Sequence, residues 1–76
     1  MPTRFIEGYK LRFYSSDRFE PPHVHAIRAG NEAKIWLRPI AVEYCHGFNS
    51  TELNHIVKLI HQNRDRLLEA WNDYFA

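Results

Sequence analysis

The fold is decided by a segment that runs Glu20-Pro21-Pro22-His23-Val24-His25-Ala26-Ile27 and continues, past Gly30-Asn31, into Glu32-Ala33-Lys34-Ile35-Trp36-Leu37-Arg38. The two prolines exclude a helix where the segment begins. The side chains that follow alternate with the period of a strand, and Gly30-Asn31 is compatible with a tight hairpin turn. We therefore expect two antiparallel strands, in which a two-residue turn would place His23 opposite Arg38 and His25 opposite Trp36.

The residues before and after this hairpin predict further strands. Phe5 to Glu7 indicates a short strand and Tyr9 to Tyr14 a longer one, because the latter alternates clearly between two faces. Ile40 to Tyr44 is ambiguous and is interpreted as a short edge strand. Ser15 to Pro22 is predicted to be a loop, since Ser-Ser-Asp and Pro-Pro are residues that favour turns.

The last third of the chain predicts one long helix over about residues 50–75. Asn49 or Ser50 can cap it, and Glu52 is placed for a capping box if Asn49 is the cap. Apolar side chains then recur at helical spacing without a Gly or Pro. The sequence therefore predicts an α+β fold in one domain over residues 1–76. A small antiparallel sheet of three to five strands lies within residues 3–45, with one long C-terminal α-helix packed on one of its faces.

Length and composition narrow the class of protein. A chain of 76 residues with one cysteine, Cys45, has room for one small domain and no internal disulfide. The net charge of +1 argues neither for nor against a nucleic-acid partner. No apolar run approaches the roughly 20 residues of a membrane span, and the first residues lack the apolar stretch of a signal peptide. We expect a cytoplasmic protein that does not bind membranes.

Strand alternation divides the predicted sheet into two faces. The face toward the helix is apolar and consists of Tyr9, Leu11, Phe13, Val24, Ala26, Ala33, Ile35 and Leu37. The opposite face carries Lys10, Arg12, Tyr14, His23, His25, Lys34, Trp36 and Arg38. Basic side chains interleaved with aromatic ones suit phosphate contacts and base stacking. The same composition also fits an ordinary solvated face or a protein-binding face.

His23 and His25 lie two residues apart and so share a face of their strand. One interpretation is metal-independent RNA cleavage, with the two histidines as general acid and base and Arg12, Lys34 or Arg38 stabilising the developing charge. The other interpretation is a metal site, which needs a third ligand from His46, Asp17, Glu20 or Glu43. Two ligands at this spacing are a weak signal, so the prediction includes no metal and no cofactor.

Four motifs together carry a resemblance to a known family. They are Glu20-Pro21-Pro22-His23-Val24-His25, Glu32-Ala33-Lys34-Ile35-Trp36-Leu37-x-Pro39, Gly47-Phe48 leading into Glu52-Leu53, and Leu67-Leu68-Glu69-Ala70-Trp71. With them the chain resembles a small bacterial family, domain-of-unknown-function family 4160, over nearly its whole length. The resemblance implies a bacterial cytosolic protein encoded beside a second small protein, an arrangement similar to toxin–antitoxin pairs. It implies no established activity.

These observations lead to a first hypothesis and two alternatives. The first is a component of a toxin–antitoxin-like module that binds RNA, and could cleave it, through Arg12, Tyr14, Lys34, Trp36 and Arg38 around the catalytic candidates His23 and His25. The second is a non-enzymatic antitoxin or scaffold. Because the helix is longer than the sheet can cover, its end with Trp71 and Phe75 would contact the neighbouring protein or a second copy of this chain. The third is a metal-binding protein that uses His23 and His25.

Overall fold

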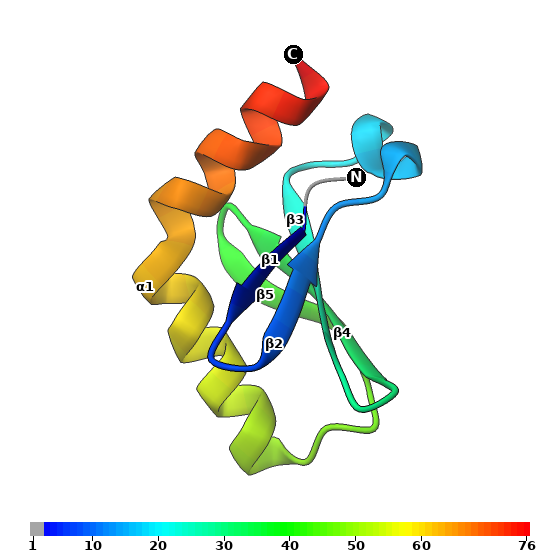
Figure 1. Cartoon of the computed structure of the whole chain (residues 1–76), viewed down its shortest axis with the longest axis vertical. Coiled ribbons are helices and arrows are strands. Elements are labelled where there is room, and N and C mark those ends of the chain that lie inside the picture. The colour runs from blue at the N-terminus through cyan, green and yellow to red at the C-terminus, as the bar shows by residue number, and fades with distance from the viewer. Residues whose placement is uncertain (1–2) are drawn as a thin grey trace.

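The computed structural model describes residues 3–76 and has two layers, a five-stranded antiparallel sheet and one long helix across one of its faces (Figure 1). The strands are β1 (Thr3–Ile6), β2 (Tyr9–Arg12), β3 (His23–Arg28), β4 (Asn31–Leu37) and β5 (Ile40–His46), and they pair in chain order. The predicted α+β fold is therefore confirmed, with five strands. The ambiguous Ile40–Tyr44 segment is an edge strand that extends to His46.

The central hairpin turns one residue earlier than predicted. Its turn is Ala29-Gly30, with φ of 51° and 80°, and not Gly30-Asn31. Both values lie in the left-handed region that the right-handed twist of a hairpin requires. The register consequently differs by two residues from the predicted one, because His23 pairs with Trp36 and His25 with Lys34. A shift of two residues keeps every side chain on its predicted face.

The core lies between the sheet and the helix. All eight residues of the predicted apolar face are buried in it. The helix contributes Ile56, Leu59, Ile60, Leu67 and Trp71. Burial of this apolar surface is the main force that holds the two layers together.

The helix α1 covers Ser50–Phe75, as the sequence predicts. Its cap is Asn49, whose side-chain oxygen accepts a hydrogen bond from the backbone N–H of Glu52 at 2.8 Å. The Glu52 carboxylate accepts a hydrogen bond from the Tyr9 hydroxyl, also at 2.8 Å, and so links the first turn of the helix to β2. Within residues 3–76, no helix combines the length and the apolar character that crossing a membrane would require.

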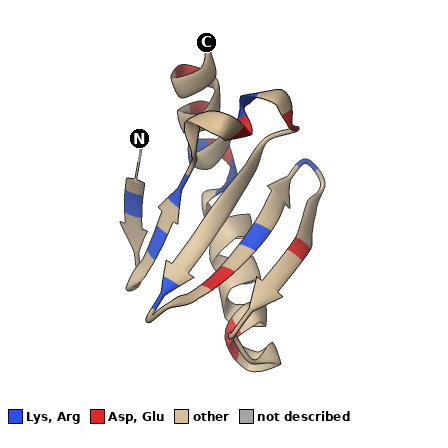
Figure 2. Cartoon of the chain, turned by 90° about the vertical axis from the view of Figure 1, so that its right-hand side faces the viewer, with Lys and Arg blue, Asp and Glu red and all other residues tan. Residues whose placement is uncertain are grey.

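A short 3-10 helix, η1 (Ser15–Phe19), replaces part of the predicted loop. The predicted strand over Tyr9–Tyr14 ends at Arg12, and the chain then turns across the sheet before it returns as β3. η1 is held by two hydrogen bonds between the same pair of residues. The Asp17 carboxylate accepts from the Tyr14 backbone N–H at 2.8 Å, and the Asp17 N–H donates to the Tyr14 carbonyl at 2.9 Å. Figure 2 shows the outer face of the sheet with α1 behind it.

Candidate functional site

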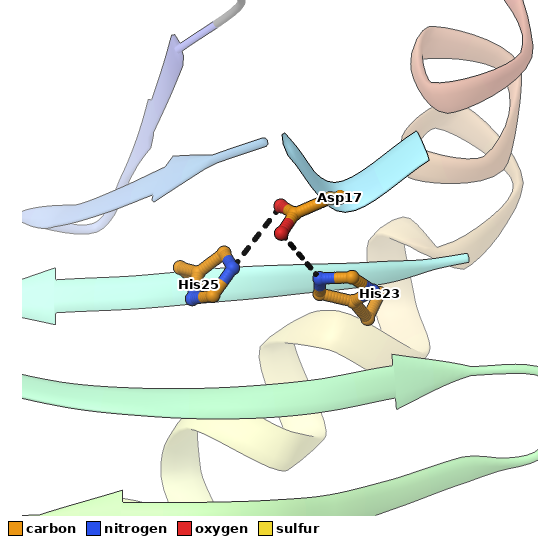
Figure 3. A group of neighbouring side chains, drawn as sticks. All are labelled: Asp17, His23 and His25. Atoms are coloured by element: carbon orange, nitrogen blue, oxygen red, sulfur yellow. Dashed lines mark hydrogen bonds and ion pairs between the residues drawn. The ribbon is translucent and has the colours of Figure 1, made fainter. Parts of the chain in front are cut away.

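Three polar side chains meet between η1 and β3. Asp17 comes from η1, and His23 and His25 come from β3, whose alternation points both imidazoles toward the outer layer (Figure 3). The Nε2 atom of His23 lies 3.2 Å from Asp17 Oδ1, and the Nε2 atom of His25 lies 3.1 Å from Asp17 Oδ2. We call these three residues the Asp17 cluster. One carboxylate therefore bridges two histidines.

Both histidine rings are also contacted at Nδ1, the nitrogen that faces away from Asp17. His23 Nδ1 lies 2.9 Å from the Pro21 carbonyl oxygen, and His25 Nδ1 lies 3.3 Å from Glu32 Oε2. The Tyr44 hydroxyl donates to that same Glu32 oxygen and lies 3.4 Å from His25 Nδ1. Each imidazole is thus contacted at both of its nitrogens.

Two groups of this site, Asp17 and Tyr44, have shifted pKa values. Burial alone would raise the pKa of Asp17, but the hydrogen bond from the Tyr14 backbone and the nearby His23 and His25 outweigh it, so that its pKa is lowered. Asp17 is therefore a carboxylate at neutral pH. Burial, followed by the hydrogen bond to Glu32, raises the pKa of Tyr44, which keeps its proton.

The two histidines are buried beneath η1, a segment of their own chain. His23 has no exposed surface, and His25 and Asp17 are each 6% exposed. η1 covers the histidines from the outer side, and the rings of Trp36 and Trp71 pack around His23 with centroids 5.2 and 5.1 Å away. Strand alternation predicts the face of a side chain but not what lies on top of it.

The other residues predicted to contact RNA surround this cluster on the outer face. The Arg12 guanidinium lies over the Tyr14 ring at 5.2 Å, and the Lys34 ammonium lies over the Trp36 ring at 4.8 Å. All four are partly buried, whereas Arg38 is exposed beyond the end of β4. The structure therefore brings two cation–aromatic pairs together around the cluster and leaves Arg38 at the rim.

Acidic residues on the outer face contact several of these groups. Glu20 forms an ion pair with Lys34, and Glu43 accepts a hydrogen bond from the Trp36 indole at 2.8 Å. Glu20 and Glu43 were two of the four candidates for an additional metal ligand, and both contact other side chains instead. A further candidate, His46, is exposed and packs against the Tyr44 ring. Of the four candidates, Asp17 is the one that the fold places beside both histidines.

The residues predicted as a partner interface pack against their own chain. Trp71 is 6% exposed and contacts the Phe13 ring at 5.3 Å between centroids. Phe75 is half-buried and stacks on Trp71 at 4.3 Å. Trp71 thus belongs to the core of this chain, and its role toward a partner stays a prediction.

Two residues of the site are absent from the sequence-based prediction. Glu32 belongs to the β4 face that also carries Lys34 and Trp36, so strand alternation contained a signal for it. Tyr44 pairs with Lys34 only because β5 contains a bulge, in which Val42 pairs with Ile35 and Glu43 is left between them. A bulge changes the face of the sheet on which the later residues of the strand lie. No pattern in this sequence predicts the bulge.

Comparison with known proteins identifies the family. The family described as "Domain of unknown function (DUF4160)" matches residues 8–72, which include β2 to β5, η1 and most of α1. None of the curated proteins and none of the solved structures matches the chain. The matched range includes every residue of the Asp17 cluster and most of the sequence. The chain therefore belongs to the DUF4160 family of domains of unknown function.

Proposed function

We propose that this protein binds RNA through the outer face of its sheet and acts as one component of a two-protein module of the toxin–antitoxin type in the bacterial cytoplasm. The observation that carries the proposal is the pair of stacks, Arg12 on Tyr14 and Lys34 on Trp36, that flank the Asp17 cluster. A cation beside an aromatic ring offers one contact to a phosphate and one to a base.

The two cation–aromatic stacks differ in whether an acidic side chain pairs with the cation. Glu20 neutralises Lys34, whose side chain is only 13% exposed. Among residues 3–76, no acidic side chain forms an ion pair with Arg12, and its Nε atom is buried without a hydrogen-bond partner. We therefore expect Arg12, together with the exposed Arg38, to contribute more to phosphate binding than Lys34 does.

Burial argues against RNA cleavage by His23 and His25. A general acid or base must come within hydrogen-bond reach of the proton that it transfers, and here His23 has no exposed surface and His25 is only 6% exposed. Both Nδ1 atoms also face an acceptor, Pro21 or Glu32, and both Nε2 atoms lie beside the Asp17 carboxylate. We therefore propose RNA binding without cleavage, in which His23 and His25 hold η1 in place through Asp17 and do not contact the RNA.

The test is binding of labelled single-stranded RNA to the full chain, measured by fluorescence anisotropy at several salt concentrations. Arg12→Ala and Arg38→Ala should each weaken binding and lower the slope of log affinity against log salt by about one. Arg66→Ala is the matched control, because Arg66 is an exposed arginine on α1, on the other layer. Its affinity should equal that of the wild type.

Two results would overturn this proposal. One is the absence of salt-dependent RNA binding by the folded protein. The other is an equal loss for Arg66→Ala and Arg12→Ala, which would indicate nonspecific attraction. A stable complex with the neighbouring small protein in the absence of any RNA binding would favour the non-enzymatic antitoxin or scaffold instead.

A further inference from the structure

The hydrogen bonds of His23 fix where its proton lies. Its Nδ1 is 2.9 Å from the Pro21 carbonyl oxygen, and a carbonyl oxygen can only accept, so Nδ1 carries the proton. A neutral imidazole has one N–H, and its Nε2 is then a bare lone pair. That lone pair lies 3.2 Å from the Asp17 carboxylate and makes no hydrogen bond, although the side chain is completely buried. Two acceptors therefore face each other in the interior.

His25 also has a carboxylate beside each of its ring nitrogens, but its hydrogen bonds differ from those of His23. Its Nδ1 faces the Glu32 carboxylate at 3.3 Å, and its Nε2 faces the Asp17 carboxylate at 3.1 Å. A proton on Nδ1 is donated to Glu32 and leaves the Nε2 lone pair facing Asp17, whereas a proton on Nε2 makes the hydrogen bond to Asp17. The two Nε2 atoms and the carboxylate oxygens thus converge on one small volume. Within residues 3–76, one ligand atom from each of the three residues can be chosen so that all lie within 4.8 Å of one another.

A positive charge is needed between these acceptors. One extra proton, on His23, would supply this charge to that ring alone, and extra protons on both rings would place two imidazolium ions side by side, with centroids 5.1 Å apart, in a buried site with one shared carboxylate. Burying like charges in contact is costly. One divalent cation provides the same charge at a single point and uses both lone pairs and the carboxylate at once.

The distance of each histidine from Asp17 and the outer contacts of both rings resemble those of metal sites in proteins. Zinc–ligand bonds of about 2.0–2.1 Å in a tetrahedron place neighbouring donor atoms about 3.3 Å apart. Each Nε2 lies close to this distance from one oxygen of Asp17, 3.2 Å for His23 and 3.1 Å for His25. A set with one atom from each residue lies within 4.8 Å, so binding would draw these atoms closer together. Histidines that bind metals donate their other N–H to a carboxylate or a backbone carbonyl. His25 faces Glu32 in this way, and His23 faces Pro21.

We propose that Asp17, His23 and His25 form a binding site for one divalent first-row transition-metal ion of the Zn²⁺ or Fe²⁺ class. Two imidazole nitrogens and one carboxylate are the ligands that such ions prefer over Mg²⁺ or Ca²⁺. Three protein ligands leave a further coordination position, which a water molecule can fill. The ion would link η1 to β3, and this inference does not depend on RNA binding.

The experiment uses the full chain, purified without a histidine tag and stripped of metal with a chelator. Zn²⁺ is titrated against a chromogenic competitor, and Co²⁺ is added separately because its visible absorption reports the geometry of its ligands. We expect one tightly bound Zn²⁺ per chain. Asp17→Asn and His25→Ala should each weaken Zn²⁺ binding at least about tenfold. The control His61→Ala removes an exposed imidazole on α1 and should change nothing.

A further variant keeps the metal-binding test informative if the Asp17 and His25 variants do not fold. Glu32 contacts His25 from its far side, and its side chain is 32% exposed, so Glu32→Gln should fold. It should lower Zn²⁺ affinity about 10–100-fold, the usual cost of losing such an outer partner. The proposal is overturned if the folded wild type binds no stoichiometric Zn²⁺ and gives no Co²⁺ ligand-field band. It is also overturned if His61→Ala weakens binding as much as His25→Ala does.

Discussion

The two faces of the sheet are both buried around β3, but for opposite reasons. On the inner face, Val24 and Ala26 pack against a helix of 26 residues through apolar contacts that need no particular direction. On the outer face, His23 and His25 are covered by a five-residue 3-10 helix and held by directed contacts with Asp17. The burial of the inner face can therefore be predicted from the alternation of the strands. The burial of the outer face depends on η1, which folds back over β3.

This difference has an energetic consequence. Apolar burial contributes stability wherever surface is removed from water. A buried polar group contributes only when its partners are in place, and it costs free energy when a partner is missing. We therefore expect the inner face to provide most of the stability and the outer face to be sensitive to single polar changes.

The largest effect is expected on the inner face. Ile35 has no exposed surface at the centre of β4, and Ile35→Ala should lower the free energy of unfolding by about 2–5 kcal/mol, because it removes apolar contacts and leaves a cavity. Urea denaturation measures the change. A loss below that of the outer-face variant described next would contradict the assignment of the core to this face.

An intermediate effect is expected for His23→Ala in buffer that contains a chelator. The variant leaves the buried Pro21 carbonyl without the N–H of His23, and one unsatisfied buried group of this kind costs about 1–3 kcal/mol. Urea denaturation again reports the loss. If His23 lay on an open surface, the change would stay within about 0.5 kcal/mol, so a value that small would show that η1 does not cover it.

The smallest effect is expected for Glu20→Gln. The Glu20 side chain is 43% exposed where it pairs with Lys34, and water screens exposed ion pairs so that they contribute little to stability. Removing this carboxylate should also free Lys34 and strengthen RNA binding in the anisotropy assay. Weaker RNA binding by Glu20→Gln would mean that the Lys34 stack does not contact the nucleic acid.

Much of the fold follows from local pattern. The helix over Ser50–Phe75 is predicted by an Asn cap, uninterrupted apolar periodicity and the absence of Gly and Pro. The buried face of the sheet is predicted because alternation is a local property. The turn position is missed by one residue, since Ala29 adopts a left-handed φ that its side chain does not favour. The edge strand β5 is predicted too short.

Less of the candidate site could be predicted, because its contacts are made between distant segments. The shared face of His23 and His25 is local and was predicted. Asp17 was one of four candidate ligands, and its selection depends on η1 folding back over β3. The contribution of Tyr44 depends on a bulge in β5. Whether a polar side chain is buried is decided by the segment that covers it, and strand periodicity carries no information on that.

The most direct test of this account is the metal content of the folded protein, purified without an affinity tag and measured by mass spectrometry of its elements. We predict one transition-metal ion per wild-type chain, its loss in Asp17→Asn, and its retention in His61→Ala. A folded wild-type protein that contains no metal, and takes up none when Zn²⁺ is added, would contradict the central claim that Asp17, His23 and His25 form a metal site.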